Sequence, residues 1–167
     1  MSRGIFISIE GPDGSGKSTQ IENIKEFFHD KNMDIIFTRE PGGTPIGERI
    51  RGIILDRKCS EMDPMTEAML YAAARAQHVA QVIRPALEKG KIVICDRFVD
   101  SSIAYQGYGR KLGEAVASIN HFAVKECMPK VVVCAILVLW EHGNQKTDTS
   151  ICYSIILFSY ASIERNC

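Results

Sequence analysis

An uninterrupted phosphate-binding motif lies near the start of the sequence. Residues 11–18 read Gly-Pro-Asp-Gly-Ser-Gly-Lys-Ser and match the pattern G-x-x-x-x-G-K-[ST]. Glycines allow backbone N–H groups to converge on phosphate oxygens, and the N-terminus of the following helix adds positive potential. In this pattern Lys17 reaches the terminal phosphates of a nucleoside triphosphate, and the Ser18 hydroxyl can ligate Mg²⁺. The alternative, a glycine-rich turn that binds nothing, requires neither of these two side chains.

An acidic residue ends a second apolar segment. Residues 91–95 read Lys-Ile-Val-Ile-Cys and are followed by Asp96. A buried strand that delivers an acid to its carboxyl end resembles the Walker B arrangement of nucleotide-binding proteins. Beside a phosphate loop we expect Asp96 to lie near the metal, although a strand-end aspartate can also cap a turn.

Further polar side chains follow the predicted strands or share one helix face. Tyr71 and Arg75 are four residues apart and therefore lie on the same side of a helix. A guanidinium binds phosphate through a fork of donors, an aromatic ring can stack on a base, and polar groups can contact a sugar or base edge. The arginines expected near one cleft are Arg39, Arg51, Arg75 and Arg97, and the polar groups are Ser102, Tyr105 and Gln106.

The periodicity of the chain predicts strands that alternate with helices. This order indicates an α/β fold with a parallel sheet of about four or five strands, flanked by helices, of the P-loop NTPase type. Ligands of such sheets bind beyond the carboxyl ends of the strands. The predicted strands are 4–10, 34–38, 91–95 and 131–139, with a possible fifth at 153–158; the predicted helices are 17–30, 45–55, 64–89 and 112–126.

Within the predicted helices, apolar residues at helical spacing indicate the buried faces. Pro85 should kink the long helix and Gly90 should end it. We expect His78 at the helix surface or behind the site, and assign it no role. The apolar residues are Ile21, Ile24, Phe27 and Phe28 in the first helix, and Met69, Ala72, Ala76, Val79 and Ile83 in the long one.

Composition excludes several classes of protein. The 167 residues are 46% hydrophobic with a net charge of zero, which argues against disorder and against a general nucleic-acid-binding surface. No apolar run reaches the ~18 residues of a membrane span, and we expect no membrane partner. The six cysteines form no C-x-x-C pair and no zinc spacing, so reduced thiols in a cytoplasmic protein are expected.

The last 37 residues differ in composition from the rest of the chain. Residues 131–167 hold five of the 20 basic and 20 acidic residues, and none of the six prolines. We therefore divide the chain into a P-loop domain at 1–130 and a divergent tail at 131–167, with strand-like runs but no recognisable lid. The tail is either a lineage-specific end or the product of a shifted reading frame, and the composition break favours the second.

Four blocks of sequence, in this order and spacing, resemble the thymidylate kinase family. The blocks are EGPDGSGKST (10–19), TREPGGTP (38–45), MLYAAARAQH (69–78) and VICDRFVDSSIAYQGYGR (93–110), and the resemblance covers about residues 4–129. It implies ATP-dependent phosphorylation of dTMP to dTDP, a step of dTTP biosynthesis, with ATP as donor, Mg²⁺ as cofactor and a homodimer as the assembly. The alternative enzyme class, another nucleoside monophosphate kinase, fits the second and third blocks less well.

The resemblance also implies roles for individual residues. Lys17, Asp13 and Arg97 are the implied catalytic residues, with Arg97 holding the dTMP phosphate. Tyr71 takes the stacking position, although it could instead be a core aromatic. The implied ATP site is Gly11, Pro12, Asp13, Gly14, Ser15, Gly16, Lys17, Ser18 and Thr19; the dTMP site is Asp13, Arg39, Glu40, Pro41, Tyr71, Arg75, Arg97, Ser102, Tyr105 and Gln106; the metal ligands are Ser18 and Asp96.

The chain departs from the family pattern in its transition-state arginine. The phosphate-loop position that could carry this arginine is Gly14, and the tail contains a single arginine, Arg165. Such an arginine contributes about 10³–10⁵ in rate where it is present. A catalytically impaired nucleotide-binding module is therefore the alternative to an active kinase.

Overall fold

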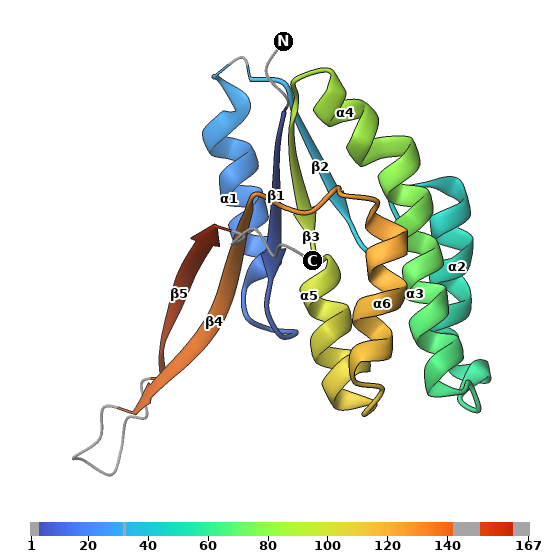
Figure 1. Ribbon diagram of the computed structural model, residues 1–167. Helices are drawn as coiled ribbons and strands as arrows, with labels where there is room; N and C mark the ends of the chain where they lie inside the picture. Colours follow the sequence, from blue (N-terminus) through green and yellow to red (C-terminus); the bar gives the residue numbers. More distant parts are fainter. Residues whose placement is uncertain (1–3, 32, 142–150, 162–167) are drawn as a thin grey trace.

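The computed structural model describes residues 4–31, 33–141 and 151–161, the last part of which (136–141 and 151–161) is described by its backbone alone. The chain forms one five-stranded sheet in the order β2-β3-β1-β4-β5, in which β1 to β4 run parallel and β5 pairs antiparallel with β4 (Figure 1). The strands are β1 (Ile5–Glu10), β2 (Ile35–Arg39), β3 (Ile92–Asp96), β4 (Val131–Glu141) and β5 (Ile151–Ala161).

The three N-terminal strands bring their carboxyl ends to one edge of the sheet. Central strands β1 and β3 are apolar and largely buried, as expected of a parallel sheet covered on both faces. Ile9 of β1 pairs with Asp96 of β3, and Asp96 pairs with Arg39 of β2. The register therefore places the acid of β3 between the phosphate loop that follows β1 and the arginine that ends β2.

Helices cover both faces of this sheet. Helix α1 lies on one side, and α3, α4 and α6 lie on the other (Figure 1). The core between the second group and the sheet includes Phe6 and Phe98, whose rings meet edge to face at 4.9 Å. The helices are α1 (Lys17–His29), α2 (Pro45–Leu55), α3 (Pro64–His78), α4 (Arg84–Glu88), α5 (Val99–Ser102) and α6 (Glu114–Val124), with short helical segments η1 (Arg57–Cys59), η2 (Val79–Ile83) and η3 (Ile103–Gly109).

The long helix predicted over 64–89 is present, with a widened turn in its second half. Pro85 has no N–H to donate, and the preceding segment η2 is a π-helical turn in which Arg84 N–H donates to Val79 O. Gly90 ends the helix with φ 76°, a left-handed conformation that glycine adopts without strain. The predicted end is therefore confirmed, while at Pro85 the structure shows this π-helical turn, and the kink stays a prediction.

Two sequence-based expectations about the helices are wrong, and one of the two positions expected for His78 is excluded. Met69 is 54% exposed and Phe27 is 60% exposed, so neither belongs to a buried stripe. His78 does not lie at the helix surface, the first of its two expected positions: its side chain is completely buried, because the face of α3 that packs inward carries polar side chains beside Ala68 and Ala72. Residues 99–109, to which we assigned no helix, form α5 and the π-helical segment η3.

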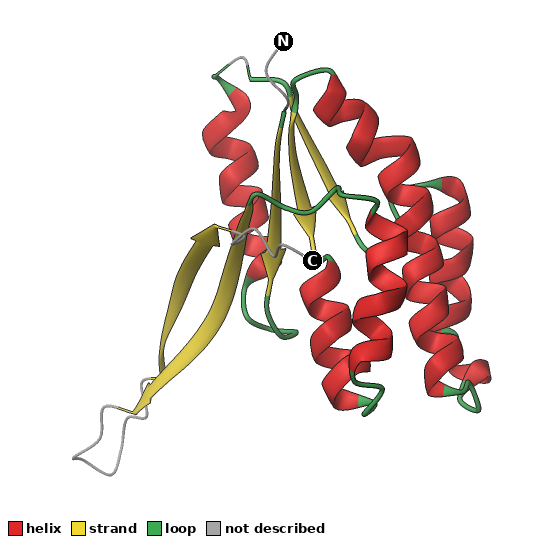
Figure 2. Cartoon of the chain, viewed as in Figure 1, coloured by secondary structure: helices red, strands yellow, loops and turns green. Residues whose placement is uncertain are grey.

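The two predicted C-terminal strands are also present and form a hairpin. β4 pairs with β1 from Val131 to Cys134 and with β5 along its whole length. Beyond Cys134 the hairpin therefore leaves the central sheet and projects away from it (Figure 2).

Candidate active site at the sheet edge

The phosphate loop connects β1 to α1 through glycines that no other residue could replace without strain. Gly11 has φ 145°, and a Cβ there would lie 2.4 Å from the carbonyl oxygen of Ala135. Gly16 precedes α1 in the left-handed region with φ 82°. Lys17 begins the helix, is buried, and donates from Nζ to the carbonyl oxygens of Gly11 at 2.9 Å and Pro12 at 2.7 Å. These two bonds hold the ammonium group of Lys17 over the phosphate loop.

The charge of Lys17 is balanced by opposing neighbours. Burial lowers the pKa of its ammonium group, and the positive charge of Arg97 lowers it further. The carboxylates of Asp96 and Asp13 act in the opposite direction and favour the charged form. A phosphate placed here would meet both cationic groups at once.

A cavity of 480 Å³ opens beside the phosphate loop. Asp96 has a buried oxygen, Oδ1, with no hydrogen-bond partner among the described residues. A buried carboxylate oxygen in this condition, in the same cavity as the Ser18 hydroxyl, suits a hard divalent cation such as Mg²⁺. The lining residues are Asp13, Gly14, Gly16, Lys17, Ser18, Thr19, Arg39, Glu40, Arg51, Asp96 and Arg97.

A second cavity of 620 Å³ adjoins the first. Asp13, Glu40, Arg51 and Arg97 line both, so the two cavities meet across two carboxylates and two guanidinium groups. Further residues around the second cavity come from four different helical segments and the turns beside them. They are Pro41, Ile54, Leu55, Glu67, Tyr71, Arg75, Phe98, Ser101, Ser102, Tyr105, Gln106, Gly109 and Arg110.

Arg97 stands at the junction of the two cavities. Its guanidinium donates to Gly11 O at 2.8 Å, to Asp13 Oδ1 at 2.5 Å and to Ser101 Oγ at 3.2 Å. Its backbone has φ 66°, a left-handed conformation that costs a non-glycine residue about 1–3 kcal/mol and that clusters at functional sites. The hydrogen bonds of the guanidinium thus hold Arg97 in place although its backbone conformation is strained.

Arg75 forms the centre of a buried polar network behind the second cavity. Its Nε donates to Glu40 Oε2 at 2.7 Å, and its Nη2 donates to the carbonyl oxygen of Phe98 at 3.0 Å. Its Nη1 donates to Ser102 Oγ and to Asn120 Oδ1 of α6. Four of the five N–H groups of the guanidinium therefore have protein acceptors, which leaves at most one for a ligand.

Comparison with known proteins identifies the family. A family model described as thymidylate kinase matches residues 9–138. The chain belongs to the thymidylate kinase family. It is 54% identical over 131 residues to a thymidylate kinase of Geobacillus thermodenitrificans, a match that covers 78% of this chain and 58% of the relative. A thymidylate kinase of Finegoldia magna is 55% identical over 130 residues, with 77% and 64% covered.

A solved structure of this family has the same fold. The crystal structure of thymidylate kinase from Ehrlichia chaffeensis superposes with a TM-score of 0.73 at 36% identity, and the match covers 79% of this chain and 74% of that one. The chain spans about three fifths of the length of the curated relatives that it matches, between 58% and 64% for the two named above.

Nine of the ten residues that the sequence analysis of this thymidylate kinase family member grouped at one site line the larger cavity, and the tenth, Arg39, lines the smaller one. Tyr71 is half-buried in the wall of the larger cavity, where burial and the negative charge of Glu67 raise the pKa of its hydroxyl. Tyr105 is 47% exposed and its ring lies 5.5 Å from the Arg97 guanidinium carbon. Gln106 is buried and donates from Nε2 to Glu67 Oε1 at 2.8 Å.

Arg39 and Pro41 lie close together near the same junction. Arg39 pairs with Glu48 at 3.1 Å and lines the smaller cavity. The carbonyl oxygen of Pro41 accepts from Arg39 at 3.2 Å and from Arg51 at 3.0 Å. Sequence reasoning placed Arg51 near the cleft but gave it no role, although it lines both cavities.

Glu10 is a second residue that sequence reasoning missed. It is the last residue of β1, it is buried, and its carboxylate accepts from Phe98 N–H at 2.7 Å and from Ser101 Oγ at 2.6 Å. Burial is the main cause that raises the pKa of Glu10 to about 7, and Asp100 contributes in the same direction. The sequence feature that could have identified Glu10 is an acidic residue at the end of an apolar strand, directly before the phosphate loop.

Proposed function

We propose that this chain binds ATP and dTMP and transfers the γ-phosphate of ATP to the phosphate of dTMP. The observation that carries the proposal is the junction of two cavities at Asp13, Glu40, Arg51 and Arg97. Two anionic nucleotides that meet there would have their reacting phosphates between the phosphate loop and a guanidinium fork. Family membership and the identity to thymidylate kinases over most of this chain support the same substrates.

On the donor side, the loop amides and Lys17 would bind the β- and γ-phosphates of ATP. Ser18 and Asp96 would hold Mg²⁺, which supplies neutralisation of charge on these phosphates when it is bound. Nζ of Lys17 already lies against the loop carbonyl oxygens, so it would be close to phosphates bound there and would stabilise the charge that develops on the bridging oxygen.

On the acceptor side, Arg97 would hold the dTMP phosphate, with Arg39 as a helper, and Tyr71 would stack on thymine. An oxygen of the dTMP phosphate forms a bond to the γ-phosphorus, the bond to the β,γ-bridging oxygen breaks, and ADP leaves with that electron pair. The attacking oxygen is anionic near neutral pH, so the reaction needs orientation and neutralisation rather than a general base.

We call the larger cavity, which would hold dTMP, the acceptor cavity. We also propose a homodimer formed through the helices beside it. Helix α3 packs against both α2 and α6. Large apolar side chains are exposed on all three: Ile46 and Ile53 on α2, Met69 on α3 and Phe122, at 76%, on α6. A contiguous exposed apolar patch marks a protein interface, and we propose that these side chains form one. Phe122→Asp should convert a dimer to a monomer in analytical ultracentrifugation.

The proposal assigns nucleotide binding to residues 1–130 and a cytoplasmic location to the protein. The residues that line the two cavities all precede the divergent tail. Free thiols at Cys59, Cys95, Cys127 and Cys134 support a reducing compartment. Among the described residues, no helix combines the length and apolar character that crossing a membrane requires.

A coupled assay of ADP formation, run beside isothermal titration with ATP and with dTMP, tests the proposal. We expect dTMP-dependent ADP formation that is fastest with dTMP, slower with dUMP, and slower still with dCMP or dGMP. The thymine methyl group in an apolar pocket is worth ~1–3 kcal/mol, so dUMP should be a poor substrate. Binding of both nucleotides without ADP formation, or a preference for purine monophosphates, would overturn the proposal.

A further inference from the structure

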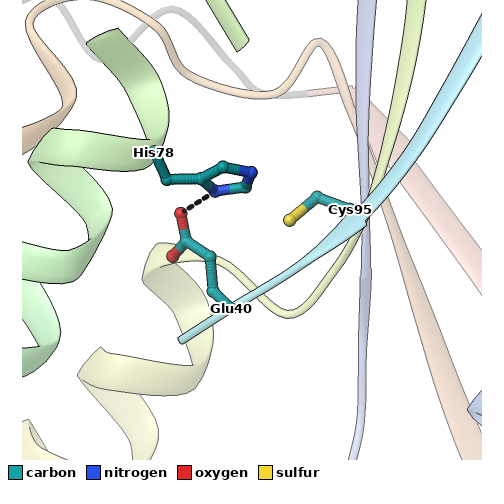
Figure 3. A group of neighbouring side chains, drawn as sticks. All are labelled: Glu40, His78 and Cys95. Carbon is teal, nitrogen blue, oxygen red and sulfur yellow. Dashed lines mark hydrogen bonds and ion pairs between the residues drawn. The ribbon is translucent and has the colours of Figure 1, made fainter. Parts of the chain in front are cut away.

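Three buried side chains of metal-binding type lie together beneath the acceptor cavity. The ligand atoms of Glu40, His78 and Cys95 lie within 4.8 Å of one another (Figure 3). All of them already have hydrogen-bond partners. His78 Nδ1 lies 2.9 Å from Glu40 Oε1, His78 Nε2 lies 2.7 Å from Thr38 Oγ1, and Cys95 Sγ donates to Arg97 O at 3.1 Å. With both ring nitrogens engaged, the cluster is a hydrogen-bond network and not a cation cage.

The network joins β2 to the buried arginine of the acceptor cavity. A carboxylate only accepts, so Nδ1 of His78 carries a hydrogen and donates to Glu40 Oε1. The other oxygen of Glu40 accepts from Arg75 Nε at 2.7 Å. Thr38 anchors the far side of the imidazole ring. The chain of contacts therefore runs from Thr38 through His78 and Glu40 to Arg75.

His78 itself cannot touch a ligand, because none of its surface is exposed. Glu40 and Arg75 do line the acceptor cavity. The orientation of a carboxylate is set by what its two oxygens accept, and here one oxygen is held by His78 and the other by Arg75. Without the hydrogen bond from His78, the Glu40 carboxylate could rotate. The guanidinium of Arg75, which is bonded to that carboxylate, would then shift, together with its one N–H group that has no protein acceptor.

We propose that His78 is a positioning residue for recognition of the acceptor base, acting through Glu40 on Arg75. This inference rests on the proposed function, since it assumes that the base occupies the larger cavity. The contact that matters is the Nδ1 donor, and the bulk of the ring has a separate role in packing. A Cβ added at Gly43 would lie 2.7 Å from the His78 ring, so the ring fills space that the backbone leaves for it.

Two amide variants separate the hydrogen bond from the packing. His78→Asn places its amide N–H near the position of Nδ1 and keeps a donor for Glu40, whereas His78→Gln places it near Nε2 and keeps only the contact with Thr38. We expect His78→Gln to raise the Kd for dTMP about tenfold, and His78→Asn to raise it less than about threefold. The Kd for ATP should stay unchanged in both, as measured by isothermal titration.

A second pair of variants acts from the other end of the network. Thr38→Val removes the hydroxyl at constant shape and should raise the Kd for dTMP about threefold, while Thr38→Ser should match wild type. This pair decides the question if the His78 variants fold poorly in thermal unfolding. Equal dTMP affinity in His78→Gln and His78→Asn, or equal losses for ATP and dTMP, overturns the positioning role.

Three outcomes separate the remaining possibilities. Stoichiometric zinc in the purified wild-type chain, measured by mass spectrometry, would overturn the hydrogen-bond network in favour of a metal site. A wild-type chain that fails to bind dTMP would overturn the proposed function and this inference together. Binding of dTMP by wild type with no difference between the matched variants would overturn the role of His78 alone.

Discussion

The phosphate loop and the acceptor cavity are built in different ways. The loop is one continuous stretch. Ser15 Oγ within it and Asp96 Oδ1 beside it are buried with no hydrogen-bond partner among the residues described. Behind the acceptor cavity, Glu40, Arg75 and Asn120 are buried and bonded to one another in a chain. The phosphate loop region leaves buried polar atoms available to a ligand, whereas most polar atoms behind the acceptor cavity are hydrogen-bonded to one another.

This difference predicts different consequences of substitution. Removing a charged group from the phosphate loop should change chemistry with little effect on folding. Removing one from the acceptor network leaves a buried partner without compensation and should destabilise the whole domain. The following substitutions test this contrast, in order of expected size.

Arg75→Met should produce the largest effect, and on stability. The variant leaves the Glu40 carboxylate buried with His78 as its remaining side-chain partner, and breaking a buried ion pair in this way costs about 3–5 kcal/mol. Urea unfolding measures the loss. Arg49→Met, an exposed arginine on α2, is the control and should change stability by less than about 0.5 kcal/mol. A loss below about 1 kcal/mol for Arg75→Met would remove the contrast between the two regions.

Lys17→Met should come next, and on turnover. The variant removes the cation that faces the transferring phosphoryl group, a change worth about 3–4 kcal/mol or a hundredfold to a thousandfold in rate. The coupled ADP assay measures it, and dTMP affinity and unfolding midpoint should stay close to wild type. Lys25→Met, on the exposed side of α1, is the matched control. Near-normal turnover by Lys17→Met would exclude the lysine from the reaction.

Glu10 lies between the two regions and should make the free energy of unfolding depend on pH. Its pKa is raised to about 7, above the ordinary 4.5, so the folded chain binds this proton more tightly than the unfolded chain. The pH-dependent cost of burying this carboxyl is therefore absent well below pH 4.5, grows between pH 4.5 and 7, and levels off at about 3 kcal/mol above that range.

The variant Glu10→Gln, which cannot titrate, isolates this effect. Urea unfolding of both proteins from pH 5 to pH 8 should show wild type losing stability relative to the variant as the pH rises. A difference between the two proteins that stays constant over this range would show that the carboxyl does not titrate there.

Tyr71 should give the smallest effect, confined to acceptor binding. Replacing the ring by leucine removes stacking on the base and should weaken dTMP binding about tenfold. Tyr71→Phe keeps the ring and should stay within about twofold, since the proposal gives the hydroxyl no contact with the base. Titration calorimetry with dTMP and with ATP shows whether the loss of affinity is confined to dTMP. If Tyr71→Leu binds dTMP as wild type does, the ring does not stack on the base.

Much of the fold could be read from residue patterns because the relevant physics is local. Apolar runs bounded by glycine and proline predicted the strands, and Gly90 predicted where the long helix stops. The phosphate loop was predictable because its glycines are adjacent in the chain and their conformational freedom depends on nothing distant. Met69 and Phe27 were misplaced because periodicity identifies an apolar face without showing what packs against it.

Local patterns determined the phosphate loop and the alternation of strands and helices, and the family resemblance indicated the acceptor residues. Only the folded chain decided that His78 and Arg75 are buried and that Glu40 joins them. Those contacts link residues 35 to 45 positions apart. Burial of a charged side chain is stable only where partners from other elements arrive to satisfy it, and no spacing along one helix reveals such partners.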